Sequence, residues 1–200
     1  HNVKFYVVAP GGCTSNIYNL PVTIHPQPLA SFNFSSPACA KSNVSFFDLS
    51  VANDGNLTEW HWDFGDGNTL TRFNSSPITH QYATGGTYNV KLTVKTNNIC
   101  YDDTIRVITV NATPDVKFDL PGNLCLPNAS ATFTNNTTIS DGTIATVAYL
   151  WNFGDPASGA SNTSTSISPT HIYTTTGTFP VRLTATSASG CSHDTTINFS

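Results

Sequence analysis

Two carboxylates in the first third of the chain are close enough in sequence to bind one cation together. Asp63 and Asp66 stand in the run Asp63-Phe64-Gly65-Asp66-Gly67, and Asn152 and Asp155 repeat the spacing further on. Several oxygen ligands could hold Ca²⁺ there. Tight turns also place Asp beside Gly, because Gly adopts positive φ and Asp accepts hydrogen bonds from backbone N–H groups. Since Asn152 lacks a carboxylate, the pattern favours turns, and no cofactor or metal is expected.

Two histidines, His80 and His171, each stand two residues before a tyrosine. A metal role would need further ligands at a set spacing, and the sequence offers none. Each histidine is therefore predicted to make a hydrogen bond that fixes a strand or loop. The chain also has no Gly-x-Ser-x-Gly, no His-Glu-x-x-His and no phosphate-binding glycine loop. The sequence therefore predicts a protein that is not an enzyme.

The same residue types recur in the same order, which identifies an internal repeat. Trp60–Asp66 aligns with Tyr149–Asp155, and Gly86–Thr93 aligns with Gly177–Thr184. Apolar and polar residues alternate in period 2 through segments rich in Thr, Val and aromatic residues, which is typical of strands with one buried face. About 86 residues with about seven strands fit an immunoglobulin-like β-sandwich. The fold class expected is all-β, as tandem sandwiches.

The repeat divides the chain into three parts. Residues 1–27 are interpreted as the C-terminal strands of a preceding, truncated repeat, and residues 28–113 and 114–200 as two repeats. Whether the last strand of the second repeat is complete or incomplete is left open. The parts meet at Pro26-Gln27-Pro28 and at Thr113-Pro114, where proline predicts short, stiff junctions. The chain is accordingly expected to be a piece of a longer protein.

The five cysteines also fall into register. Cys39 and Cys125 come early in their repeats, Cys100 and Cys191 come late, and Cys13 is the late cysteine of the truncated repeat. This register predicts Cys39–Cys100 and Cys125–Cys191 disulfides and an oxidising compartment. Pairing between neighbouring repeats, such as Cys13 with Cys39, remains the alternative.

The composition limits the partners. Only 10% of residues are charged, the formal net charge is −4, and no basic run is present. A nucleic-acid partner would require clustered Lys and Arg, so none is expected. No apolar stretch approaches the ~20 residues of a membrane span.

The sequence of the aromatic strand, together with the segments after it, resembles that of a known domain family. Trp60-His61-Trp62-Asp63-Phe64-Gly65-Asp66-Gly67 and the segments that follow it resemble the PKD (polycystic kidney disease) domain. Its second copy is similar to a variant of secreted Bacteroidota proteins. The positions that carry the family pattern are Trp62, Asp63, Phe64, Gly65, Asp66, Gly67, Trp151, Phe153, Gly154 and Asp155.

The resemblance implies an extracellular or cell-surface β-sandwich, found in tandem arrays and beside the catalytic domains of secreted hydrolases. It implies spacing, adhesion, protein contact and sometimes polysaccharide contact as roles. We therefore expect a non-catalytic structural or adhesive repeat, with neighbouring repeats, copies of itself or surface polysaccharide as partners. The alternatives are an accessory region of a secreted hydrolase and a carbohydrate-binding module.

Two finer expectations concern individual side chains. Trp60, Trp62 and Phe64 lie on one face of a predicted strand, where they could stack on sugars, but Trp62 and Trp151 are expected in the core. Asp103-Thr104-Ile105 and Asp194-Thr195-Thr196 resemble an O-glycosylation acceptor, so Thr104 and Thr195 are candidate glycan sites, with a plain strand start as the alternative. Low charge and open sheet edges further suggest self-association into a filament or layer.

Overall fold

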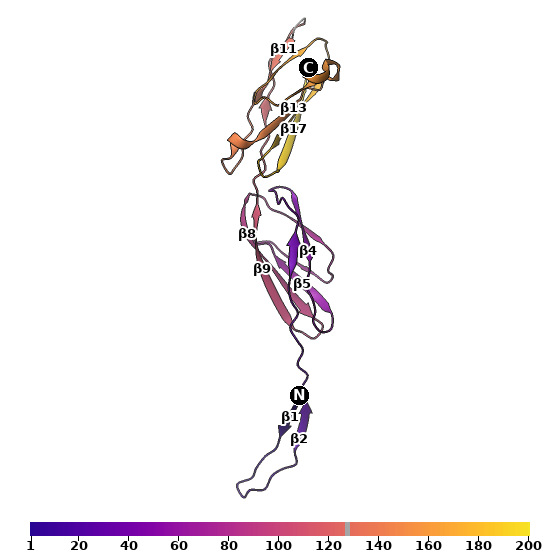
Figure 1. The fold of residues 1–200 in the computed structure, drawn as a ribbon, viewed down its shortest axis with the longest axis vertical. Helices are drawn as coiled ribbons and strands as arrows, with labels where there is room; N and C mark the ends of the chain where they lie inside the picture. The colour runs from indigo at the N-terminus through magenta and orange to yellow at the C-terminus, as the bar shows by residue number, and fades with distance from the viewer. Residues whose placement is uncertain (127–128) are drawn as a thin grey trace.

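The computed structural model describes residues 1–126 and 129–200 and arranges them as a row of three parts along one axis (Figure 1). At one end is a hairpin of β1 (Asn2–Phe5) and β2 (Tyr18–Pro21). Two β-sandwiches follow, each built from antiparallel pairs. The predicted all-β fold of tandem sandwiches is confirmed.

The first sandwich has two sheets. One has the order β3-β4-β7, and the other has the order β6-β5-β8-β9. The strands are β3 (Phe32–Phe34), β4 (Asn43–Asp48), β5 (Leu57–Asp63), β6 (Thr69–Arg72), β7 (Ile78–Gln81), β8 (Gly86–Thr96) and β9 (Tyr101–Val110). The long β8–β9 hairpin runs the whole length of the sandwich, so its turn and its open end lie at opposite ends (Figure 1).

The second sandwich repeats this plan with shorter pieces. Its large sheet has the order β14-β13-β16-β17, and two pairs, β10-β12 and β11-β15, form the opposite layer. The strands are β10 (Phe118–Asp119), β11 (Ala129–Thr132), β12 (Thr134–Asn135), β13 (Ala148–Asn152), β14 (Thr163–Ser164), β15 (Thr170–Tyr173), β16 (Phe179–Thr186) and β17 (Ser192–Phe199). Two 3₁₀ segments, η1 (Ile144–Thr146) and η2 (Pro156–Asn162), flank β13.

Period-2 alternation places one face of each strand in a core. Val90, Leu92 and Val94 of β8 are fully buried, while the residues between them face outward. Trp62 of the first core lies edge-on to Phe32, with ring centroids 5.1 Å apart, and Trp151 of the second core packs on Phe118 in the same way at 5.0 Å. The core positions predicted for Trp62 and Trp151 are confirmed.

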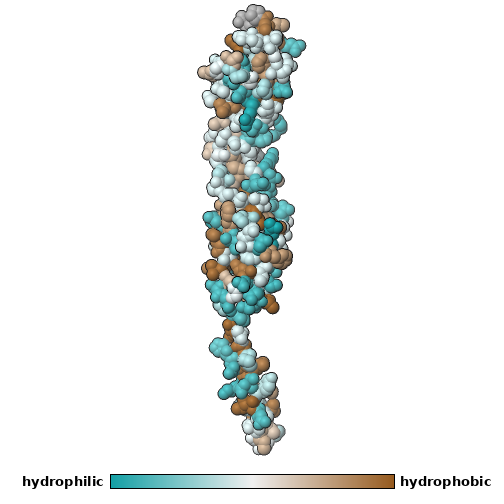
Figure 2. All heavy atoms as spheres, turned by 90° about the vertical axis from the view of Figure 1, so that its right-hand side faces the viewer, coloured by the Kyte–Doolittle hydropathy of each residue, from teal (hydrophilic) through white to brown (hydrophobic). Residues whose placement is uncertain are grey.

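The N-terminal hairpin has no such core. Val3 and Phe5 are 53% and 63% exposed, although their counterparts in the repeat, Val90 and Leu92, are 0% exposed. Figure 2 shows brown apolar side chains among the teal ones on this slender end. The apolar face of the hairpin is therefore left without the opposing sheet that covers the same face in both sandwiches.

Within the described ranges, no helix is long and apolar enough to cross a membrane.

Candidate functional site

The predicted turns occur at the end of the aromatic strand in both sandwiches. In the first, the Gly65 N–H donates to Asp63 Oδ1 at 2.9 Å, and the Asn68 N–H donates to Asp66 Oδ1 at 3.1 Å. In the second, the Gly154 N–H donates to Asn152 Oδ1 at 2.9 Å. An amide oxygen serves as well as a carboxylate in this role, which explains why Asn can stand at position 152. Across residues 1–126 and 129–200, no three potential metal-ligating side chains gather at one place.

The second carboxylate of each turn pairs with a histidine. His80 Nε2 lies 2.8 Å from Asp66 Oδ2. The imidazole of His80 also stacks on the Phe64 ring, with centroids 3.9 Å apart and planes 7° from parallel. Tyr82 meets His80 edge-on at 4.6 Å, and its hydroxyl donates to the Phe64 carbonyl at 3.2 Å. The four side chains thus tie β7 to the end of β5.

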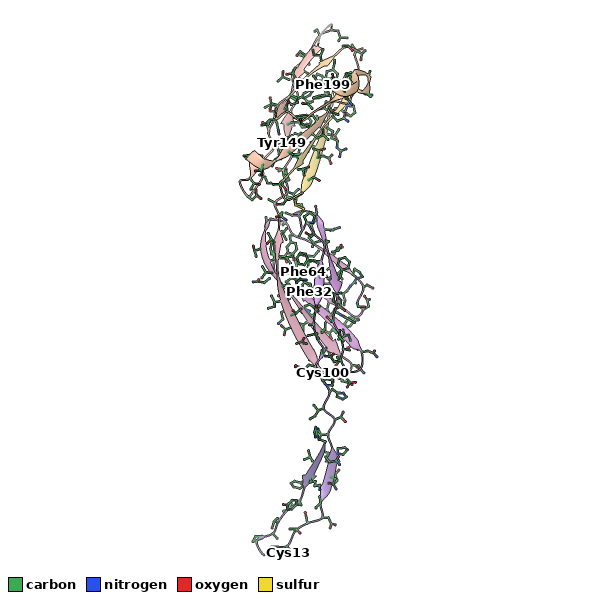
Figure 3. All side chains as sticks on the ribbon, in the orientation of Figure 1. Cys13, Phe32, Phe64, Cys100, Tyr149 and Phe199 are labelled. Carbon is green, nitrogen blue, oxygen red and sulfur yellow. A yellow bond between two sulfur atoms is a disulfide. The ribbon has the colours of Figure 1, made fainter. Side chains whose placement is uncertain are left out.

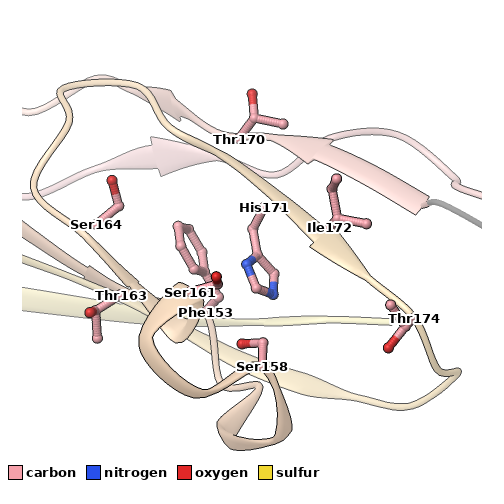
Figure 4. Close-up of a pocket in the computed structure, with 9 residues that line it drawn as sticks. All are labelled: Phe153, Ser158, Ser161, Thr163, Ser164, Thr170, His171, Ile172 and Thr174. Atoms are coloured by element: carbon pink, nitrogen blue, oxygen red, sulfur yellow. The ribbon is translucent and has the colours of Figure 1, made fainter.

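The second sandwich builds the same cluster. His171 Nε2 lies 3.1 Å from Asp155 Oδ2, and the imidazole stacks on Phe153 at 4.5 Å (Figure 4). The Tyr173 hydroxyl donates to the Phe153 carbonyl at 2.9 Å. The prediction that each histidine fixes a strand by a hydrogen bond is confirmed. We call these two sets, Asp66/His80/Tyr82 and Asp155/His171/Tyr173, the clamp clusters.

Each clamp cluster pairs an aspartate with a histidine, as a hydrolytic triad does, but contains no serine, threonine or cysteine. A hollow of about 450 Å³ beside His171 is lined by serine and threonine side chains (Figure 4). One of these serines, Ser158, donates its hydroxyl to the backbone carbonyl of Asp155 at 2.7 Å. Among the described residues, no hydroxyl hydrogen-bonds to the His171 ring, so the imidazole activates no nucleophile. The clamp clusters are built to stabilise the fold.

Electrostatics match this structural role. Burial, followed by the nearby Asp66 carboxylate, raises the pKa of Tyr82 far above its usual value of 10, so its hydroxyl remains a donor. Burial and the nearby Asp155 raise the pKa of Tyr173 in the same way. The phenol of each clamp cluster therefore stays protonated over the physiological pH range.

The disulfide connects the two sandwiches, and this overturns the predicted pairing. Cys39 is bonded to Cys191, across 152 residues of sequence, while Cys100 and Cys125 are free thiols. The Cys39–Cys100 and Cys125–Cys191 pairs are therefore wrong. The alternative of pairing between neighbouring repeats was the right class, although the partners differ from Cys13 with Cys39.

The length of one strand explains the error. Cys100 precedes β9, whereas Cys39 pairs with Asn111, directly after β9. The ten residues of β9, at about 3.4 Å each, separate the two ends by about 34 Å. A disulfide requires Cα atoms within about 7 Å of each other. Cys39 thus lies at the end of the first sandwich that meets the second one. Cys100 lies at the opposite end (Figure 3).

The linker between the sandwiches is anchored on both sides. The Thr113 hydroxyl donates to the Ala40 carbonyl of the first sandwich at 2.6 Å, and the Asn111 amide donates to the Ala38 carbonyl at 3.2 Å. Asp115 exchanges backbone hydrogen bonds with Thr138 of the second sandwich. Pro114 lies between these two anchors. The linker and the disulfide together connect the sandwiches at two points.

The family profile described as the PKD domain matches residues 25–110 and 111–199. The chain belongs to the PKD domain family. Collagenase ColA of Clostridium perfringens is 35% identical over 81 residues, which are 40% of this chain and 7% of that protein. The pre-pro-metalloprotease PrtV of Vibrio cholerae is 40% identical over 70 residues, or 34% of this chain and 7% of that protein. The chain thus spans only a small share of these relatives.

Among solved structures, the PKD1 domain of Vibrio anguillarum Epp is similar. It shares 29% sequence identity with a TM-score of 0.39, covering 44% of this chain and 96% of that one. The similarity of this chain lies within PKD domains, which are non-catalytic accessory modules of larger proteins.

The other residues named from the sequence have structural contacts in the PKD domains. Trp60 is only 6% exposed, and its indole N–H donates to Asp48 Oδ2 at 2.8 Å, so its face is unavailable for stacking on a sugar. The aspartates beside the candidate glycan sites form cross-strand ion pairs, Asp103 with Lys91 and Asp194 with Arg182. Thr104 is half-buried on β9.

Thr195 donates its hydroxyl to the Val116 carbonyl at 2.8 Å. Glycosylation of Thr104 and Thr195 stays a prediction.

A substitution in the first turn should separate backbone strain from steric overlap. Gly65 has φ +76°, and an added Cβ would meet the Asn89 carbonyl oxygen of β8 at 2.6 Å. Gly67 also has positive φ, at +91°, but an added Cβ meets nothing within 4 Å. Gly65→Ala should cost about 2–5 kcal/mol from both causes, and Gly67→Ala only about 1–2 kcal/mol from the first. Urea denaturation of the two variants would measure this, and equal losses would contradict the geometry.

The clamp cluster of the first domain should make its stability depend on acid. Burial raises the pKa of the Asp66 carboxyl, but hydrogen bonds from His80 and Asn68 lower it by more, so it lies below its usual 3.8. Since the folded domain binds this proton less readily than the unfolded chain, its contribution is complete above about pH 4 and is lost as pH falls further. Asp66→Asn, which keeps an acceptor oxygen for the turn, should flatten thermal stability between pH 5 and 3. An unchanged acid dependence would contradict the pairing.

Proposed function

We propose that this chain is an extracellular spacer, in which each PKD domain is held to its neighbour in a fixed orientation. The observation that carries the proposal is the Cys39–Cys191 disulfide between the two domains. A disulfide within a domain would stabilise the fold only, whereas one between domains fixes their relative position. Such a connection suits a module that keeps two parts of a protein at a constant distance or transmits force between them.

Apart from the disulfide, the hydrogen bonds at the junction are made by the linker. Among the described residues, no side-chain hydrogen bond or ion pair joins residues 28–110 directly to residues 116–199; the linker contacts each domain separately. One tether alone would leave the domains free to rotate about Pro114. The disulfide adds a second covalent connection beside the linker, and two connections restrict bending and twisting more than one connection does.

The chemistry of the surface supports a location outside the cell. Structural disulfides persist in oxidising compartments. The chain has 8 Lys and Arg and 12 Asp and Glu in 200 residues, so Ser, Thr and Asn form most of the polar surface. This surface has little sensitivity to salt, which suits a spacer exposed to changing surroundings.

Small-angle X-ray scattering of the oxidised chain tests the spacer proposal. A spacer predicts that a single extended conformation fits the scattering profile across a range of protein concentrations. A profile that requires a mixture including sharply bent domain pairs would rule the proposal out.

An accessory role in a secreted hydrolase is the second candidate, because the matched relatives are a collagenase and a metalloprotease. Deleting residues 25–199 from the full natural protein separates the two candidates. If the chain assists a hydrolase, the deletion should lower turnover of the polymeric substrate and spare that of a small soluble one. A full-length protein with no hydrolytic activity would leave the spacer role alone.

Adhesion or self-association extends the spacer proposal. Two large apolar side chains of the sheet-edge strand β9 face solvent, Ile105 at 58% and Val107 at 62% exposure. An exposed strand edge with apolar side chains is suited to pairing with a second chain. Light scattering at rising concentration should show oligomers that Ile105→Lys abolishes, and a chain that stays monomeric throughout would contradict self-association in this region.

A further inference from the structure

The turn that carries the late cysteine has one geometry in all three parts of the chain. The residue four before the cysteine donates its N–H to the cysteine carbonyl at 2.9 Å, and the residue just before the cysteine has positive φ. The three sets are Ala9, Gly12 (φ 83°) and Cys13; Thr96, Ile99 (φ 63°) and Cys100; and Ser187, Gly190 (φ 83°) and Cys191. Cys191, the one bonded to the neighbouring domain, is therefore presented by a turn that Cys100 and Cys13 share.

Cys100 also lies beside a linker, as Cys191 does. Asn98, in the turn before Cys100, donates to Asp54 Oδ2 at 3.3 Å. His25, in the linker that follows the N-terminal hairpin, binds the same carboxylate oxygen at 2.5 Å. Figure 3 places Cys100 at the end of the first domain where this linker arrives. Cys100 thus lies at the end of the first domain that a preceding domain would meet.

Cys125 occupies the other half of the junction. It aligns with Cys39 in the repeat and is exposed, with a free thiol. Its neighbours Leu124 and Leu126 line a hollow together with Phe199 and Ser200, at the far end of β17 from Cys191. Cys125 is therefore presented at the end of the second domain that would meet a following domain.

We propose that Cys100 and Cys125 each form the same interdomain disulfide as Cys39–Cys191, with a preceding and a following PKD domain of the same protein. Each domain would then contribute its early cysteine to the next junction and its late cysteine to the previous one. This inference rests on the proposed spacer function and extends it from one junction to every junction of an array.

The exposed hairpin supports the preceding partner. Val22 and Ile24 align with Ile108 and Val110 of β9, which are 0% and 2% exposed, yet they are themselves 37% and 71% exposed. A preceding sandwich that covers these side chains would place its own early cysteine beside the linker at residues 25–28. That cysteine would meet Cys100 as Cys39 meets Cys191.

The bond forms by thiol–disulfide exchange with a small or protein disulfide as oxidant. One thiolate attacks the donor disulfide and releases one donor thiol, and the second thiolate then attacks the mixed disulfide and releases the other. The two cysteines lose two protons and two electrons, and the donor disulfide becomes two thiols. Oxidised glutathione can supply this reaction in the test.

An extended chain tests the proposal with the residues of this protein alone. Ser200 aligns with Thr109, and Thr109 aligns with Thr23, so residues 1–200 followed directly by residues 24–200 continue the repeat in register. In this chain the first-copy Cys125 faces the second-copy Cys100. After refolding with a glutathione redox buffer at low protein concentration, free thiols are alkylated without reduction and disulfide-linked peptides are mapped by mass spectrometry.

The expected result is a peptide that links first-copy Cys125 to second-copy Cys100, with three alkylated cysteines, the number of free thiols in the 200-residue chain. First-copy Cys125→Ala should leave second-copy Cys100 to be alkylated. Five alkylated cysteines, or a link between separate chains through Cys125, would overturn the proposal. If Cys39–Cys191 remains intact in that case, the spacer function stands and only its extension fails; if Cys39–Cys191 is also absent, both fail.

Discussion

Trp151→Ala is expected to destabilise the second PKD domain by about 3–5 kcal/mol. The Trp151 side chain is fully buried between Phe118, Phe133 and Phe153, and its indole N–H donates to the Ser166 carbonyl at 3.0 Å. Alanine would leave a cavity between the two sheets and an unpaired carbonyl. Since a domain is stable by only about 5–15 kcal/mol, this loss is a large fraction of the total.

Differential scanning calorimetry is the suitable measurement, because Trp151 is itself the only tryptophan of the second domain. The midpoint of that domain should fall by roughly 15 °C or more. Leu150→Ala is the matched control, since Leu150 is the preceding residue on β13 but is 50% exposed on the opposite face. It should change stability by about 0.5 kcal/mol at most. Equal losses from Leu150→Ala and Trp151→Ala would contradict the placement of the core.

Removal of the interdomain disulfide should have the largest effect on the arrangement of the domains. A variant with Cys39→Ala and Cys191→Ala keeps both cores, because neither cysteine belongs to them. It loses the second of the two connections between the domains. The linker anchors at Thr113 and Asp115 remain, so we expect folded domains that reorient about Pro114.

Residual dipolar couplings measured by NMR would show this loss. In the oxidised protein, one alignment tensor should fit the couplings of both domains. In the double variant, the two domains should require tensors of different magnitude. Cys125→Ala, which removes an exposed free thiol, is the control and should keep a single tensor. A single tensor for the double variant would mean that the linker alone fixes the orientation.

Much of the fold could be predicted from the sequence because its causes are local. The alternation of apolar and polar residues in β8 predicts which of its side chains are buried. The turns at Asp63 and Asn152 are predicted because Asp and Asn accept backbone hydrogen bonds and Gly adopts positive φ. The partner of His80 could also have been found, since Asp66 and His80 recur together as Asp155 and His171. The pair was missed because the aspartates were assigned to turns and the histidines to separate hydrogen bonds.

The disulfide could not be predicted from the register of the cysteines alone. Cys39–Cys100 and Cys39–Cys191 are equally consistent with one early and one late cysteine in each repeat. What distinguishes them is the position of each cysteine along the sandwich axis, and this depends on the length of β9 and on the chain direction at the linker. These are properties of tertiary structure, and the order of the cysteines in the sequence contains neither of them.

The identity of the disulfide-linked peptides in the oxidised 200-residue chain tests the central claim most directly. After alkylation of free thiols and proteolysis without reduction, mass spectrometry should find one linked pair, Cys39 with Cys191, and should find Cys13, Cys100 and Cys125 alkylated. Linked peptides that join Cys39 to Cys100 and Cys125 to Cys191 would instead place both bonds within domains and would contradict the covalent junction.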